Sequence, residues 1–237
     1  MDNEAIGRLN ELPEIRLADL DRDPEMERLQ YASLSARIKL SFSDMRQAVR
    51  ILLDEKPSEP RLLFFVLMSD VIFFLNFGLK FVISPTEQVQ SSVPEEFAGA
   101  LGGLITVAFL LRTMTLYGVS AVTCFVCRLF GGKGDWRETR TGIFWASLVA
   151  APIGLLGALC VVGLEYLAVI DPIFLQPMFM MPAQLIGMVA FVFFVSATVA
   201  ESHGFRNTSP IFIIFSLVTI AFVVATLYLQ QQVVQAL

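Results

Sequence analysis

The chain begins with a polar segment and continues as a series of long apolar stretches. Residues 1–40 mix acidic and basic side chains with scattered leucines, a pattern that predicts a polar, mobile arm. The five apolar stretches that follow cover residues 62–83, 97–127, 142–167, 178–200 and 210–229. Each has the ~20 residues that a helix needs to cross ~30 Å of hydrocarbon. The pattern predicts an all-α integral membrane protein with five transmembrane helices over residues 61–230 and a short tail, residues 231–237, outside the cytoplasm.

A different periodicity occupies residues 41–60. The apolar residues that recur there at helical spacing are Phe42, Met45, Val49, Leu52 and Leu53. Ser41 and Asp44 form a capping-box pair, while Pro57 and Pro60 bound the far end. This predicts a cytoplasmic N-terminal amphipathic helix followed by a proline-rich break. The helix lies either in the membrane interface, with its arginines toward lipid phosphates, or on the protein's own cytoplasmic loops.

The distribution of charge supports this division. Of the 17 basic and 22 acidic residues, 10 and 13 precede residue 62, so the apolar part is strongly depleted in charge. The net charge is −5 and no basic stripe is present, which excludes a nucleic-acid partner. The lipid bilayer is therefore the partner that the composition predicts.

The connections between the apolar stretches predict the orientation. Basic residues are found in the connections 128–141 and 201–209, whereas 84–96 and 171–177 carry acidic residues and no basic ones. The basic segment 41–61 precedes the first stretch. By the positive-inside rule, the N-terminus is cytoplasmic and the C-terminus lies outside.

Two charged residues lie deep in the apolar stretches. Asp70 is eight residues into the first stretch, about 12 Å from its cytoplasmic start. Arg112 is 15 residues into the antiparallel second stretch, which leaves it about 8 Å from the same face. Because unpaired charges are costly at this depth, we expect an ion pair between them. It serves either as a structural clamp or as part of a gated or proton-coupled path.

Small residues recur at four-residue spacing on two of the stretches, a pattern that lets helix backbones approach closely. These residues are Gly99 and Gly103 in the second stretch and Ala146, Ala150, Gly154 and Ala158 in the third. They predict helix packing, either inside one five-helix bundle or across a homodimer.

Candidate chemistry is sparse. Cys124 and Cys127 form a C-x-x-C pair, but a zinc site would also require Cys160 and His203 to converge, so we interpret the cysteines as small hydrophobes. Residues 131–134 read GGKG but lack the Ser or Thr that follows Lys in a phosphate-binding loop. The sequence contains no nucleophile–base set. We therefore expect no enzyme activity, no metal site and no cofactor.

One connection resembles a known family. The segment Arg128–Pro152, RLFGGKGDWRETRTGIFWASLVAAP, is similar to the connection between the second and third spans of bacterial members of the Yip (Ypt/Rab-interacting protein) family. The residues of this cytoplasmic loop that carry the resemblance are Gly131, Gly132, Lys133, Gly134, Trp136 and Arg137. The similarity extends over about residues 43–230.

The resemblance implies five spans with a cytoplasmic N-terminus and a place in a bacterial inner membrane. Eukaryotic relatives bind prenylated Rab-type GTPases and one another. This sequence lacks their DLYGP-type motif ahead of the first span, so GTPase binding is not transferred.

Two functions are compatible with these observations. The first is a non-enzymatic membrane protein that organises or supports membrane components through helix packing, as a homo-oligomer or with other membrane proteins. Its working parts would be the helix 41–55 and the loop 128–141. The alternative is a small transporter or channel that uses the Asp70/Arg112 pair.

Overall fold

The computed structural model describes residues 33–83 and 95–236, and within them every regular element is helical. The α-helices are α4 (Leu34–Ser43), α5 (Met45–Asp54), α6 (Glu59–Ile83), α7 (Glu95–Leu129), α8 (Trp136–Ala168), α9 (Pro177–Ser202) and α10 (Ser209–Ala236), and η2 (Pro172–Leu175) is a 3-10 helix. The predicted arm up to residue 32, most of the connection 84–96 and residue 237 lie outside the described residues.

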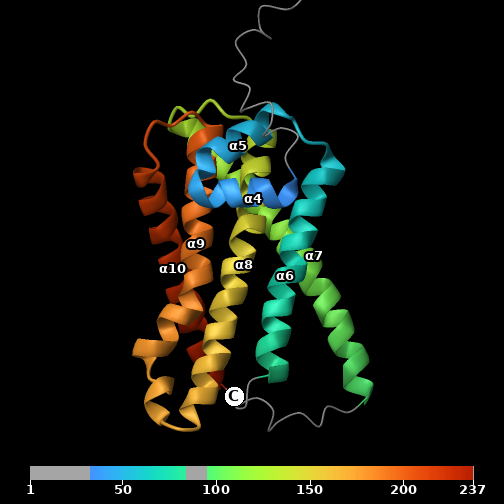
Figure 1. Cartoon of the computed structure of the whole chain (residues 1–237), viewed down its shortest axis with the longest axis vertical. Helices are drawn as coiled ribbons and strands as arrows, with labels where there is room; N and C mark the ends of the chain where they lie inside the picture. The colour runs from blue at the N-terminus through green and yellow to red at the C-terminus, as the bar shows by residue number, and fades with distance from the viewer. Residues whose placement is uncertain (1–32, 84–94, 237) are drawn as a thin grey trace, which may run out of the picture.

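Five long helices run side by side and α4 and α5 lie across one end of them (Figure 1). Each predicted apolar stretch falls within one of these helices, α6 to α10. In the described part of the chain, four segments are long and apolar enough to cross a membrane: Thr106–Leu129, Trp136–Ala168, Pro177–Ser202 and Ser209–Thr226. We call the end of the bundle at which α4 and α5 lie the head end.

Local sequence explains where several helices begin. At the start of α8, Asp135 accepts a hydrogen bond from the Glu138 amide and Glu138 accepts one from the Asp135 amide, over 2.7 and 2.9 Å. This reciprocal capping box satisfies two amides that the helix leaves without partners. Helix α9 begins at Pro177, where the missing N–H costs nothing.

The predicted start of the first helix is wrong. The chain forms two short helices rather than one, and the first begins at Leu34, within the segment predicted as an arm. Asp44 is the N-cap of α5 and accepts from the Gln47 amide over 2.9 Å. Ser41 caps nothing: it is buried within α4, where its hydroxyl donates to the Arg37 carbonyl and accepts from the Trp145 indole. A serine at this spacing can hydrogen-bond inside a helix as readily as at its start.

The buried core is concentrated at the head end. Phe65 of α6 packs edge-to-face on Trp145 of α8, with ring centroids 5.2 Å apart. Val49 of α5 and Val195 of α9 complete the same cluster. Many large apolar side chains elsewhere on the long helices are exposed, as expected for helices whose outer faces contact lipid.

Helices α8 and α9 approach closely through small residues. A Cβ atom on Gly187 would lie 2.6 Å from the Gly154 Cα, and one on Gly157 would lie 2.6 Å from the Ala183 carbonyl oxygen. Ala146, Ala150 and Ala158 of the predicted stripe are buried inside the chain. These residues therefore take part in helix packing within the chain.

The other predicted small residues, Gly99 and Gly103, lie in the first part of α7, where the structure describes only the helical backbone.

We expect Gly187→Val to destabilise the membrane domain by about 1–3 kcal/mol, because the new side chain would overlap the Gly154 backbone. The matched control is Gly163→Val in α8, where an added Cβ meets nothing within 4 Å. Thermal unfolding of both purified variants in the same detergent measures the difference. Equal stability of the two variants would contradict this account of the contact.

Candidate functional site

A cluster of polar side chains lies inside the bundle where α6, α7 and α8 meet. Arg112 of α7 forms an ion pair with Oδ1 of Asp70 on α6. The other carboxylate oxygen, Oδ2, accepts a 2.8 Å hydrogen bond from the Thr113 hydroxyl. The Arg112 guanidinium also donates to the hydroxyls of Ser69 (3.1 Å) and Ser147 (3.2 Å), which are themselves 2.8 Å apart. The structure therefore brings the two predicted residues together and surrounds them with three hydroxyls.

Burial differs between the two charges. Asp70 is completely buried, whereas 22% of the Arg112 side chain is exposed. The guanidinium carbon lies 4.7 Å from the centroid of the Phe73 ring, a cation–π contact. Both carboxylate oxygens and the guanidinium thus have partners, which is the condition for keeping an ion pair in an apolar interior.

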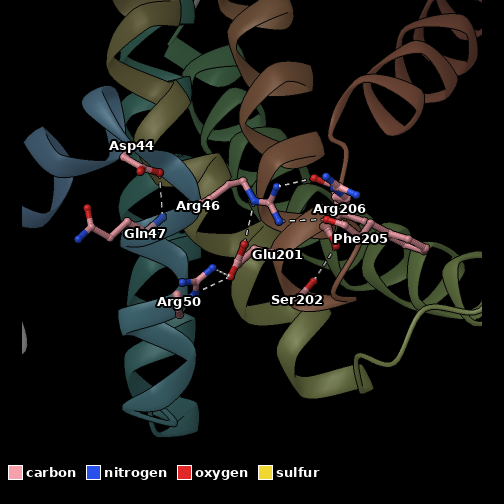
Figure 2. A network of polar contacts seen from close by, with 9 residues as sticks. Asp44, Arg46, Gln47, Arg50, Glu201, Ser202, Phe205 and Arg206 are labelled. Atoms are coloured by element: carbon pink, nitrogen blue, oxygen red, sulfur yellow. Dashed lines mark hydrogen bonds and ion pairs between the residues drawn. The ribbon is translucent and has the colours of Figure 1, made fainter. Parts of the chain in front are cut away.

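A second polar cluster joins α5, at the head end, to the end of α9 and the residues that follow it. Glu201, at the end of α9, forms ion pairs with Arg46 (2.8 Å) and Arg50 (2.7 Å) of α5. Arg46 also donates to the carbonyl oxygens of Phe205 and Arg206, each over 3.0 Å (Figure 2). The hydrogen bond and the charge of Glu201 raise the pKa of Arg50 above its ordinary value. These arginines therefore bind the protein's own chain, and α5 packs against the long helices α8 and α9, whereas the sequence predicts a place for it either in the membrane interface or on the cytoplasmic loops.

Further ion pairs tie the remaining head segments to the long helices. Glu55 pairs with Arg37 of α4 and, over 2.8 Å, with Arg61 of α6. Arg140 of α8 pairs with Glu59 of α6. The Glu55 pairs therefore join α4 and the end of α5 to the start of α6, and the Arg140 pair joins α6 to α8.

The glycine-rich loop closes around the end of α9. His203 is almost fully buried there, and its Nε2 lies 2.9 Å from the Thr139 hydroxyl. A Cβ atom on Gly132 would lie 2.7 Å from the His203 Nδ1, and one on Gly134 would lie 2.4 Å from the Ser202 carbonyl oxygen. Only glycine fits these two positions, so the motif serves close packing rather than phosphate binding.

Two further features fix this loop. Gly131 has a φ of 84°, a conformation that favours glycine, and the Lys133 amide donates to the His203 carbonyl over 3.1 Å. Burial lowers the pKa of His203 below its ordinary value. The histidine is therefore a neutral packing partner for the loop at physiological pH.

The two remaining predicted loop residues lie at the start of α8. Arg137 donates to the Pro57 carbonyl over 2.9 Å and so joins the loop to the segment between α5 and α6. Trp136 is 37% exposed and its ring lies 5.8 Å from the Arg140 guanidinium carbon.

Sequence reasoning missed several of these residues. Ser69, Thr113 and Ser147 carry no motif, although a hydroxyl beside each predicted charge is a usable signal. Glu201 was interpreted only as part of a loop. Within the described residues, no three His, Cys, Asp or Glu side chains gather as metal ligands.

We expect either Asp70→Arg or Arg112→Asp alone to destabilise the fold by about 3–5 kcal/mol, since each leaves an uncompensated buried charge. The double exchange should recover a large part of the folded yield, measured by size-exclusion chromatography in detergent. A double variant that is no better than the worse single variant would show that the pairing is not what these residues contribute.

Comparison with known proteins agrees with the resemblance carried by the 128–152 segment. The family model described as the Yip1 domain matches residues 40–229, a range that begins within α4 and ends within α10. It contains both polar clusters and the glycine-rich loop. No curated protein and no solved structure matches the chain at a significant level. Because the family model covers most of the chain, this protein belongs to the Yip1-domain family.

Proposed function

We propose that this protein is a non-enzymatic membrane protein that organises or supports other membrane components through its helices and its head. The observation that carries the proposal is that the two charged side chains inside the bundle, Asp70 and Arg112, are paired with each other. Asp70 is completely buried, and both of its oxygens have partners on α7. A carboxylate held in this way stabilises helix contacts and is not poised to bind and release a solute.

The proposed topology has five spans, with α6 as the additional one. Three observations support it: α6 lies along α8, its 25 residues exceed the ~20 that a crossing needs, and Arg112 balances its buried Asp70. The loop with Lys133 and Arg137 lies at the head end, on the same side as α4 and α5. The positive-inside rule supports a cytoplasmic head end and a C-terminus outside in this proposed topology. The resemblance to bacterial members of the family supports the inner membrane of a bacterium as the proposed location.

The organising role requires partners at exposed surfaces. Trp136 offers one such position, because it is partly exposed at the head end, whereas Trp145 is 1% exposed and serves as its matched control. We expect a photoreactive phenylalanine analogue at position 136 to form crosslinks in native membranes, to a second copy or to another membrane protein. The same analogue at position 145 should crosslink only within the chain.

The measurement is mass spectrometry of the crosslinked products, combined with the oligomeric state of the purified protein. A strictly monomeric protein that forms no intermolecular crosslink from position 136 would overturn the organising role.

The alternative function is a small transporter or channel, favoured by the 22% exposure of the Arg112 side chain and by Pro152 and Pro182 inside α8 and α9. It predicts that proteoliposomes show an ion or proton flux that Arg112→Gln abolishes. We expect no flux above that of empty liposomes, with Gly163→Val as the control for reconstitution. A flux that is lost in Arg112→Gln would replace the organising role with transport.

A further inference from the structure

An apolar groove runs between the second half of α7 and the first turns of α10. Its volume is about 790 Å³, and its lining includes Cys127, which belongs to the main core. The apolar residues along its walls include Val119 and Val126 of α7, Phe130 directly after α7, and Ile211, Ile214 and Val218 of α10. The two helices share few direct contacts, so the space between the walls is available to another molecule within the membrane.

The length of the groove matches one leaflet of a bilayer. Along α7 it extends from Thr115 to the end of the helix at Leu129, 14 residues or about 21 Å, and along α10 from Pro210 to Val218, eight residues or about 12 Å. Half of the hydrocarbon core is ~15 Å thick. A transmembrane helix of a second copy would need a groove about twice as long, whereas one acyl chain fits.

The mouth of the groove is polar and cationic. Arg206 and Asn207 line it at the head end, both exposed, and no acidic residue is among the described residues that line the groove. The nearest acidic residue in the sequence, Glu201, is occupied by Arg46 and Arg50. The guanidinium of Arg206 and the amide of Asn207 at the mouth of the groove are suited to bind a phosphate group, to which Arg donates charge-assisted hydrogen bonds.

The head holds this mouth in place. Arg46 of α5 donates to the carbonyl oxygens of Phe205 and Arg206, so the backbone that presents the Arg206 side chain is fixed from the α5 side (Figure 2). A prepared cationic rim above an apolar groove of one-leaflet length is the arrangement expected of a lipid site.

We propose that this groove binds one acyl chain of an anionic phospholipid from the leaflet at the head end, with the phosphate held by Arg206 and Asn207. Anionic headgroups are favoured over zwitterionic ones because the mouth carries a cation and no carboxylate. The site is independent of the organising role, which concerns protein partners, and the experiment below measures lipid binding alone.

The test uses the full chain purified in a non-ionic detergent, with phosphatidylglycerol and phosphatidylcholine of identical acyl chains as probes and inorganic phosphate as a third arm. Binding is measured by native mass spectrometry and by the shift in the thermal unfolding midpoint. We expect one tightly bound phosphatidylglycerol per chain, weaker binding of phosphatidylcholine, and no stabilisation by phosphate.

Two variants and their controls separate the headgroup from the acyl chain. Arg206→Gln should weaken phosphatidylglycerol binding about tenfold and leave phosphatidylcholine binding closer to that of the wild type. Ile214→Trp should abolish the binding of both lipids by filling the groove. The controls are Lys133→Gln, an exposed cation at the same end, and Ile220→Trp, an exposed position of α10 that does not line the groove.

Three results would overturn the proposal. They are equal binding of the two lipids, unchanged binding in both Arg206→Gln and Ile214→Trp, and stabilisation by inorganic phosphate equal to that by phosphatidylglycerol. A fourth, self-association that Ile214→Trp disrupts without any effect on lipid binding, would make a second copy the occupant of the groove.

Discussion

The ion pair between Asp70 and Arg112 is the contact on which the arrangement of the first three long helices depends. In hydrocarbon there is no water to solvate either group, so each charge forces its helix to remain where the other can reach it. The pair joins α6 to α7, and the hydroxyls of Ser69 and Ser147 extend the contact to α8. Hydrophobic burial cannot supply this constraint, because an apolar side chain is as well solvated by lipid tails as by another helix.

A complementary constraint acts at the head end, where a buried aromatic core meets a ring of ion pairs. Trp145 and Phe65 fill the interior, while Glu55, Glu59 and Glu201 each bind arginines from other helices. The glycine-rich loop adds a close backbone contact around His203. The head end is thus held by contacts between several different helices and loops. In Figure 1, the far end of α7 stands apart from α8, whereas α6 still reaches α8 there, because the Tyr166 hydroxyl donates to the Ile83 carbonyl over 3.0 Å.

The proposed lipid groove lies at the head end of the bundle, between α7 and α10. Where α7 and α10 leave a space at the head end, the walls are apolar and the mouth carries Arg206. Arg46 of α5 donates to the carbonyl oxygens of residues 205 and 206, and it also forms an ion pair with Glu201. A lipid at this mouth and the position of α5 therefore share one backbone segment, residues 205–206.

The sequence by itself determined the features that depend on composition and on distance along a helix. The five apolar stretches are visible because hydrocarbon demands about 20 apolar residues per crossing, and the depth of Asp70 and Arg112 follows from 1.5 Å per residue. Family membership likewise follows from residues 40–229.

Only the tertiary structure decided which groups meet. Ser41 has the spacing of a cap but bonds Trp145, because its position in α4 turns it toward α8. The glycines of the 131–134 loop resemble a phosphate site but are required by the approach of His203. Gly187 and Glu201 have no local signal, since their roles exist only where α9 crosses α8 and α5. Contacts between helices far apart in sequence depend on packing geometry, which periodicity within one helix does not encode.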